Sequence, residues 1–172
     1  MKRLFLLFVI FSGISLHAQQ KANAVIKTNG DTVWCDEATI RYNLSNKISK
    51  VECKGGSVDE VDGKEVAFVK FSNRTLLFSD TGYDFDEVII FGKKYYLTMG
   101  STDNGSRYFQ ILDKDRKFIK RVPRGIDTYD VLEEYFGDCP EFIKAIDKVA
   151  DETKEKNMND NIITIAEMYN CK

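Results

Sequence analysis

Short runs of alternating apolar and polar residues, separated by turn signals, fill residues 22–122. A period of two is typical of strands with one buried face. Asn29-Gly30 and Asn104-Gly105 are hairpin signals, because Asn and Gly both tolerate positive φ. We therefore expect an antiparallel β meander that forms a curled sheet or a partly closed barrel. Within it, we expect Asp31–Tyr42 to be one long strand.

The pattern changes after residue 122, where apolar residues recur at helical spacing. Asp127 is expected to cap a helix over Thr128–Phe136, and Asp138-Cys139-Pro140-Glu141 has the residue types of a second helix start. Strands followed by helices predict the α+β class. We expect a single domain over 19–172, with a β-rich body at 22–122 and a helical tail at 127–171.

The tail contains two cysteines, one near each end of a predicted helical hairpin. Helices joined by a short turn are normally antiparallel, so Cys139 and Cys171 are expected to lie close together. A disulfide between them would close a loop of about 32 residues and stabilise the fold by about 3–4 kcal/mol. The alternative is two free thiols at helix ends.

The other two cysteines, Cys35 and Cys53, are expected to face each other across a hairpin centred on Leu44. Four cysteines allow three pairings. We favour Cys35–Cys53 together with Cys139–Cys171 over the two crossed arrangements. The alternative for Cys35 and Cys53 is that both are small buried apolar residues.

Residues 1–18 have the pattern of a signal peptide. Lys2 and Arg3 precede the apolar run Leu4–Ile14, and Ala18 is a small residue at the cleavage position. The chain is therefore expected to be exported, to the periplasm or the outside of the cell. An uncleaved anchor is the alternative. No other stretch is long and apolar enough to span a bilayer, so we expect no transmembrane segment in the mature chain.

Cleavage would leave 154 residues with 23 Lys and Arg against 27 Asp and Glu, a net charge of −4. That balance argues against nucleic-acid binding. Cleavage would also remove His17, the single histidine of the chain. Triads with histidine and histidine-containing metal sites are then excluded. Phosphate-binding glycine loops and GxSxG are also absent from the sequence. We accordingly assign no catalytic residue, cofactor or metal.

One acidic cluster surrounds Gly82 and consists of Asp80, Asp84, Asp86 and Glu87. Oxygen-rich loops can bind calcium, and two facing carboxylates can hydrolyse glycosides. The spacing fits no EF-hand, and alternation along a strand would separate Asp86 from Glu87. A solvated loop is the interpretation we favour.

A basic run follows the hairpins and consists of Lys114, Arg116, Lys117, Lys120, Arg121 and Arg124. Such a run could contact an anionic surface, for example lipid headgroups or a polysaccharide. The interpretation we favour is a charged edge strand that resists aggregation.

Aromatic residues are frequent in the predicted strands. They could line a pocket for an apolar ligand, but more often such residues form the core. The residues concerned are Trp34, Phe68, Phe71, Phe78, Phe85, Phe91, Tyr95, Tyr96, Tyr108 and Phe109.

The exported N-terminus, the hairpin Asn29-Gly30-Asp31-Thr32, and the tail motifs Asp138-Cys139-Pro140 and Tyr169-Asn170-Cys171 together resemble a group of uncharacterised secreted proteins common in Bacteroidetes. The resemblance implies a periplasmic or surface location and a helical tail behind a β-rich body. It brings no activity and no catalytic residues. This chain departs from the pattern in having Cys35 and Cys53 in its first hairpin.

The sequence favours a non-enzymatic binding or interaction module. Its ligand would be a partner protein, a glycan or an apolar molecule. One alternative is a small hydrolase that uses carboxylates alone, and another is a structural component of the envelope.

Overall fold

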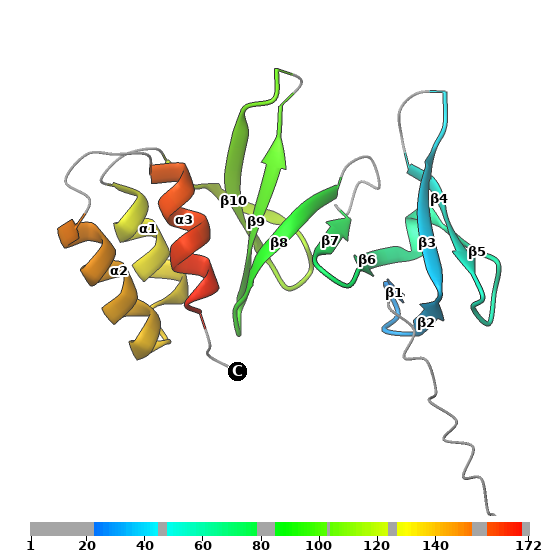
Figure 1. The fold of residues 1–172 in the computed structure, drawn as a ribbon, viewed down its shortest axis with the longest axis horizontal. Coiled ribbons are helices and arrows are strands. Elements are labelled where there is room, and N and C mark those ends of the chain that lie inside the picture. The colour runs from blue at the N-terminus through cyan, green and yellow to red at the C-terminus, as the bar shows by residue number, and fades with distance from the viewer. Residues whose placement is uncertain are drawn as a thin grey trace, which may run out of the picture.

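The computed structural model describes residues 23–44, 48–78, 85–102, 104–123, 127–152 and 158–169. Over these ranges eleven strands are followed by three helices, which makes the fold α+β (Figure 1). The helices stand at one end of the molecule and a small sheet at the other, with a large sheet between them. The predicted signal peptide lies outside the described residues.

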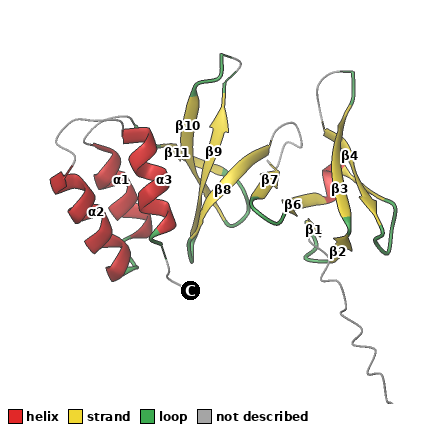
Figure 2. Ribbon diagram, in the orientation of Figure 1, coloured by secondary structure: helices red, strands yellow, loops and turns green. Residues whose placement is uncertain are grey.

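Eight strands form one antiparallel sheet in the order β11-β10-β9-β8-β7-β6-β1-β2 (Figure 2). Its described strands leave two edges, β11 and β2, so the sheet is open and not a closed barrel. The strands are β1 (Asn23–Lys27), β2 (Thr32–Cys35), β6 (Val66–Lys70), β7 (Thr75–Phe78), β8 (Phe85–Phe91), β9 (Tyr95–Ser101), β10 (Arg107–Asp113) and β11 (Phe118–Arg121).

A second sheet of three strands packs against the N-terminal part of the first. Its order is β3-β4-β5, and a short 3-10 helix, η1, leads from β5 back to β6. Buried valines from both sheets form a shared apolar core. The elements are β3 (Glu37–Tyr42), β4 (Ile48–Lys54), β5 (Glu60–Asp62) and η1 (Gly63–Glu65).

The strand predicted over Asp31–Tyr42 is wrong as one element, because the chain changes sheets at Asp36. β2 belongs to the large sheet and β3 to the small one. The Asp36 carbonyl accepts a hydrogen bond from Asn23 Nδ2 at 2.7 Å, and its amide donates to the Lys54 carbonyl at 2.9 Å. Asp36 is therefore bonded to both sheets at the crossing.

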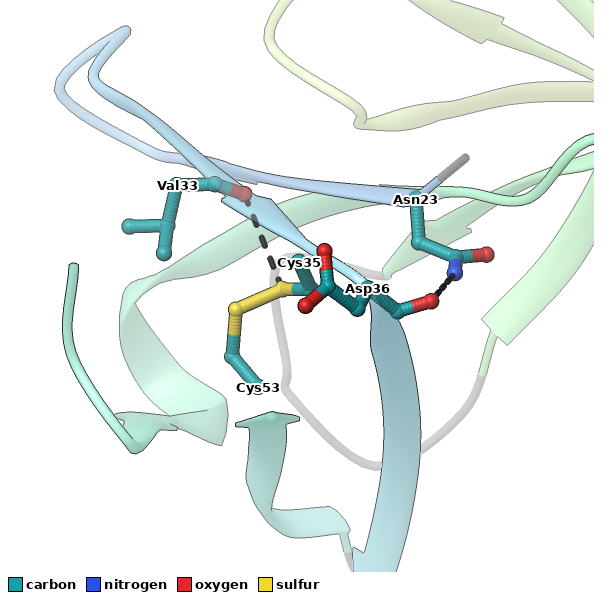
Figure 3. The surroundings of a disulfide bond; sticks show 5 residues. All are labelled: Asn23, Val33, Cys35, Asp36 and Cys53. Carbon is teal, nitrogen blue, oxygen red and sulfur yellow. Dashed lines mark hydrogen bonds between the residues drawn. A yellow bond between two sulfur atoms is a disulfide. The ribbon is translucent and has the colours of Figure 1, made fainter. Parts of the chain in front are cut away.

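Cys35 on β2 and Cys53 on β4 form a disulfide, with their Cα atoms 5.2 Å apart (Figure 3). This is the favoured pairing, but its predicted geometry is wrong. Ala38 is the residue opposite Cys53 in the β3–β4 ladder, whereas Cys35 pairs with Asn23 in the other sheet. The bridge therefore joins two sheets instead of two strands of one hairpin. Such bridges are typical of proteins outside the reducing cytosol.

Three helices cover one face of the β8–β11 end of the large sheet (Figure 1). Their apolar residues and those of the strands form one buried cluster. None of the helices in the described residues is long and apolar enough to cross a membrane. The helices are α1 (Asp127–Phe136), α2 (Pro140–Glu152) and α3 (Met158–Glu167).

The start of α2 lies beside the residues that follow α3, as expected for antiparallel helices. The Phe142 and Tyr169 rings meet edge to face with centroids 5.1 Å apart. Cys139 is fully buried and disulfide-bonded. Cys171 lies outside the described residues, so the Cys139–Cys171 pairing stays a prediction.

Candidate functional site

A row of polar side chains crosses four strands on the face of the large sheet opposite the helices. Thr98 on β9 is the cross-strand partner of Gln110 on β10, which is in turn the partner of Arg121 on β11. Cross-strand partners point to the same face of a sheet. Side-chain hydrogen bonds bring Asp86 on β8 and Tyr108 on β10 into the same row. Residues that alternate with this row along β9 and β10 pack toward the helices.

Asp86 is the acidic member of the row and is only 7% exposed. Its Oδ2 accepts hydrogen bonds from Thr98 Oγ1 at 3.2 Å and from Gln110 Nε2. Its Oδ1 accepts one from the Tyr108 hydroxyl at 3.3 Å. A buried carboxylate is tolerated only when it is hydrogen-bonded in this way. Asp86 therefore holds three neighbouring side chains in place.

Gly100 makes this arrangement possible, since it lies directly opposite Tyr108 in the β9–β10 ladder. A Cβ atom at Gly100 would overlap both the Tyr108 phenol and the Asp86 carboxylate. Because Gly100 has no side chain, Tyr108 can fold over β9 at this position and reach Asp86.

Substituting Gly100 with alanine should therefore push Tyr108 away from Asp86. Overfilling a packed site typically lowers the free energy of unfolding by about 1–3 kcal/mol, and urea denaturation would measure it. The neighbouring exposed residue gives the control, because Ser101→Ala should change stability by less than about 0.5 kcal/mol. Equal stability of Gly100→Ala and wild type would show that Tyr108 is not held where the structure places it.

Beside this row lies a groove of about 450 Å³ at the turn end of the β9–β10 hairpin. Its described lining includes two arginines and three hydroxyl side chains, and none of these described lining residues is acidic. The lining residues are Thr102, Ser106, Arg107, Tyr108, Phe109, Arg121, Val122 and Pro123. We call this the arginine groove. Its guanidinium and hydroxyl donors suit an anionic or polar ligand.

Arg121 is stacked on Tyr108, with its guanidinium carbon 4.2 Å from the ring centroid. Stacking occupies the face of the ring and leaves the edge of the planar guanidinium, where the N–H groups lie, available for hydrogen bonds. Tyr108 is itself hydrogen-bonded to Asp86. The buried carboxylate thus fixes the tyrosine, and the tyrosine orients the arginine in the groove.

The basic run lies partly on an edge strand, as the charged-edge interpretation expected, because β11 carries Lys120 and Arg121. Other residues of the run contact the rest of the protein. Lys114 Nζ lies 4.0 Å from the Tyr96 ring centroid, and burial lowers the pKa of its ammonium group. The Arg116 guanidinium donates to the carbonyls of Val66 at 3.3 Å and Phe78 at 3.2 Å. These contacts link the β10–β11 turn to distant strands of the same sheet.

Lys120 and Arg121 leave β11 on opposite faces. Lys120 turns to the helices, where its Nζ lies 3.4 Å from a Glu134 oxygen and 5.9 Å from the Tyr135 ring centroid. Arg121 turns to the groove. Arg124 lies outside the described residues.

The predicted acidic cluster is not brought together as a site in the described residues. Asp80 and Asp84 lie outside them, Asp86 is buried in the row described above, and Glu87 is half-buried. The solvated-loop interpretation is wrong for Asp86. Among the described residues, no group of three or more acidic, cysteine or histidine side chains could hold a metal ion.

The aromatic residues divide between core and surface. Phe78 and Phe109 are buried, whereas Trp34 and Phe91 are half exposed. The core interpretation is therefore wrong for Trp34, which lies on an edge strand. Tyr108 and Phe109 are the two from the predicted set that line the arginine groove.

Sequence reasoning did not single out Arg107, Thr102 or Ser106. All three flank the Asn104-Gly105 turn, which was recognised only as a hairpin signal. Polar residues on both sides of such a turn meet when the hairpin closes, and that would have been the available clue. No protein-family model, curated protein or solved structure matches this chain.

Proposed function

We propose that this protein is a binding module without catalytic activity and that the arginine groove binds an acidic ligand. The observation that carries the proposal is the placement of Arg121, which is stacked on Tyr108 and lines a groove whose described lining residues include no carboxylate. A guanidinium held in this way loses little side-chain entropy when it forms a bidentate pair with a carboxylate or similar oxyanion.

The chemistry of the groove favours binding over hydrolysis. Glycosidases need two carboxylates that face each other across a cleft. Asp86 is the carboxylate of the polar row beside the groove. Both of its oxygens already accept hydrogen bonds from neighbouring side chains. Its role here is to position Tyr108.

The proposal includes export of the chain. Two observations support it: residues 1–18 have the pattern of a signal peptide, and the body of the protein contains the Cys35–Cys53 disulfide. The ligand would then be an acidic polymer or protein met in the periplasm or at the cell surface.

Arg121→Ala should weaken binding of an acidic probe by about tenfold or more, because charge-assisted hydrogen bonds contribute about 1.5–3 kcal/mol. Fluorescence anisotropy with labelled polygalacturonate and labelled poly-glutamate would measure the dissociation constants. The wild-type affinity should also fall as salt is raised.

Arg74→Ala is the matched control. Arg74 is also exposed and lies over an aromatic ring, with its guanidinium carbon 5.5 Å from the Phe71 centroid, but it does not line the groove. It should leave binding unchanged. Failure of the wild type to bind either probe, or equal losses in the two variants, would contradict the proposal.

A further inference from the structure

One side of the arginine groove is formed by β11, which is an edge of the large sheet. In the described residues β11 pairs with β10 alone. An edge strand presents backbone N–H and C=O groups that can pair with an added strand.

The register of β10 and β11 shows which backbone groups face outward. The Val122 amide donates to the Phe109 carbonyl at 2.9 Å, and Gln110 is the partner of Arg121. In an antiparallel ladder, hydrogen-bonded and non-hydrogen-bonded pairs alternate. The Arg121 N–H and C=O therefore point away from β10, toward the open edge, while the Arg121 side chain lies over Tyr108 in the groove.

The two charged side chains of β11 contact groups on the two faces of the sheet. Lysines and arginines on edge strands normally discourage pairing. Here Lys120 pairs with Glu134 on α1, and Arg121 stacks on Tyr108 in the groove. Two of the exposed side chains on β11 are apolar, since Phe118 is 60% and Ile119 is 40% exposed; the third, Arg121, lies over Tyr108. Exposed apolar side chains on an edge strand are a feature of interaction sites.

We propose that β11 accepts an extended acidic peptide segment of a partner protein as an added strand. The residue of the segment opposite Arg121 would place an Asp or Glu side chain in the groove, beside Arg107. A second copy of this chain is a poorer occupant, because pairing two β11 edges would bring the Lys120 and Arg121 charges of both copies together. This inference rests on the proposed function and names the ligand class for the same groove.

The test uses the mature, oxidised protein and a labelled peptide with alternating Glu and Val. In an extended peptide the N–H groups of alternate residues point to opposite edges of the strand. Two N-methylated forms of the peptide are compared, one methylated at the amides of one edge and the other at the amides of the opposite edge. Both retain all side-chain charges, so they separate strand pairing from simple charge attraction. We expect the unmodified peptide to bind, and methylation of one edge to weaken binding by about tenfold or more. Methylation of the other edge should have little effect.

Equal binding of the two methylated forms and the unmodified peptide would overturn strand addition. Binding of polygalacturonate through Arg121 without any binding of the peptide would also overturn strand addition. The proposed function would survive that result. If the peptide fails to bind and sedimentation shows a dimer, the edge belongs to a second copy and the inference is wrong. Loss of all binding, to peptide and polygalacturonate alike, would overturn both proposals.

Discussion

Replacing Phe136 with alanine is expected to lower the free energy of unfolding by about 3–5 kcal/mol, as is typical for deletion of a buried aromatic ring. Phe136 is 1% exposed at the end of α1. Its ring meets those of Phe142 and Tyr169 edge to face, at centroid distances of 6.2 and 6.0 Å. These contacts join α1 to α2 and to the residues after α3.

The same ring packs against the sheet at Gly92, in the turn between β8 and β9. A Cβ atom at Gly92 would lie 2.9 Å from two carbons of the Phe136 ring, so the glycine leaves the room that the ring fills. Loss of the ring would therefore open a cavity between the helices and the sheet, where little can move in to fill it.

Urea denaturation followed by circular dichroism would measure this loss. Phe118→Ala is the control, because it removes the same side chain from an exposed site and should change stability by less than about 0.5 kcal/mol. A loss below about 1 kcal/mol in Phe136→Ala would show that the helices do not pack on the sheet as described.

The second large effect is expected for the double variant Cys35→Ala/Cys53→Ala. The two cysteines are 18 residues apart in sequence. A bridge that closes a loop of that length stabilises the folded state by about 3 kcal/mol in the chain-entropy model. For a chain of this size the melting temperature should fall by about 6–12 °C.

Hydrogen exchange would locate the effect. The bridge joins β2 to β4, so amides of the small sheet should lose protection, whereas those of β9 and β10 should be less affected. The comparison to make is with wild type under the same oxidising conditions. An unchanged melting temperature, or uniform loss of protection over both sheets, would contradict the assignment of the bridge as a link between sheets.

The hairpins could be predicted because their signals are local. Gly30 and Gly105 adopt the positive φ values, 91° and 78°, that the Asn-Gly turns require. The change of sheet at Asp36 could not be predicted, because both flanking segments are extended and alternate as strands do. It depends on which partner strands are available, which is decided by tertiary packing.

The site was harder to predict than the fold. Asp86 has the sequence context of a polar loop, but Tyr108, 22 residues away, folds over Gly100 to reach its carboxylate. The pairing of β8 with β9 also has a register shift between Val88 and Ile90. An extra residue in a strand changes which side chains share a face, and the sequence gives no sign of it.

The order of strands has a consequence for how the chain folds. From β6 to β11 every strand pairs with the next one in sequence, so each pairing closes only a short loop and can form early. β1 is different, because its partner β6 lies beyond the whole small sheet. During synthesis β1, the first strand of the described residues, must therefore wait for residues 66–70 before it can pair on that side. Until then, β1 can pair only with β2, in the N-terminal hairpin that carries Cys35.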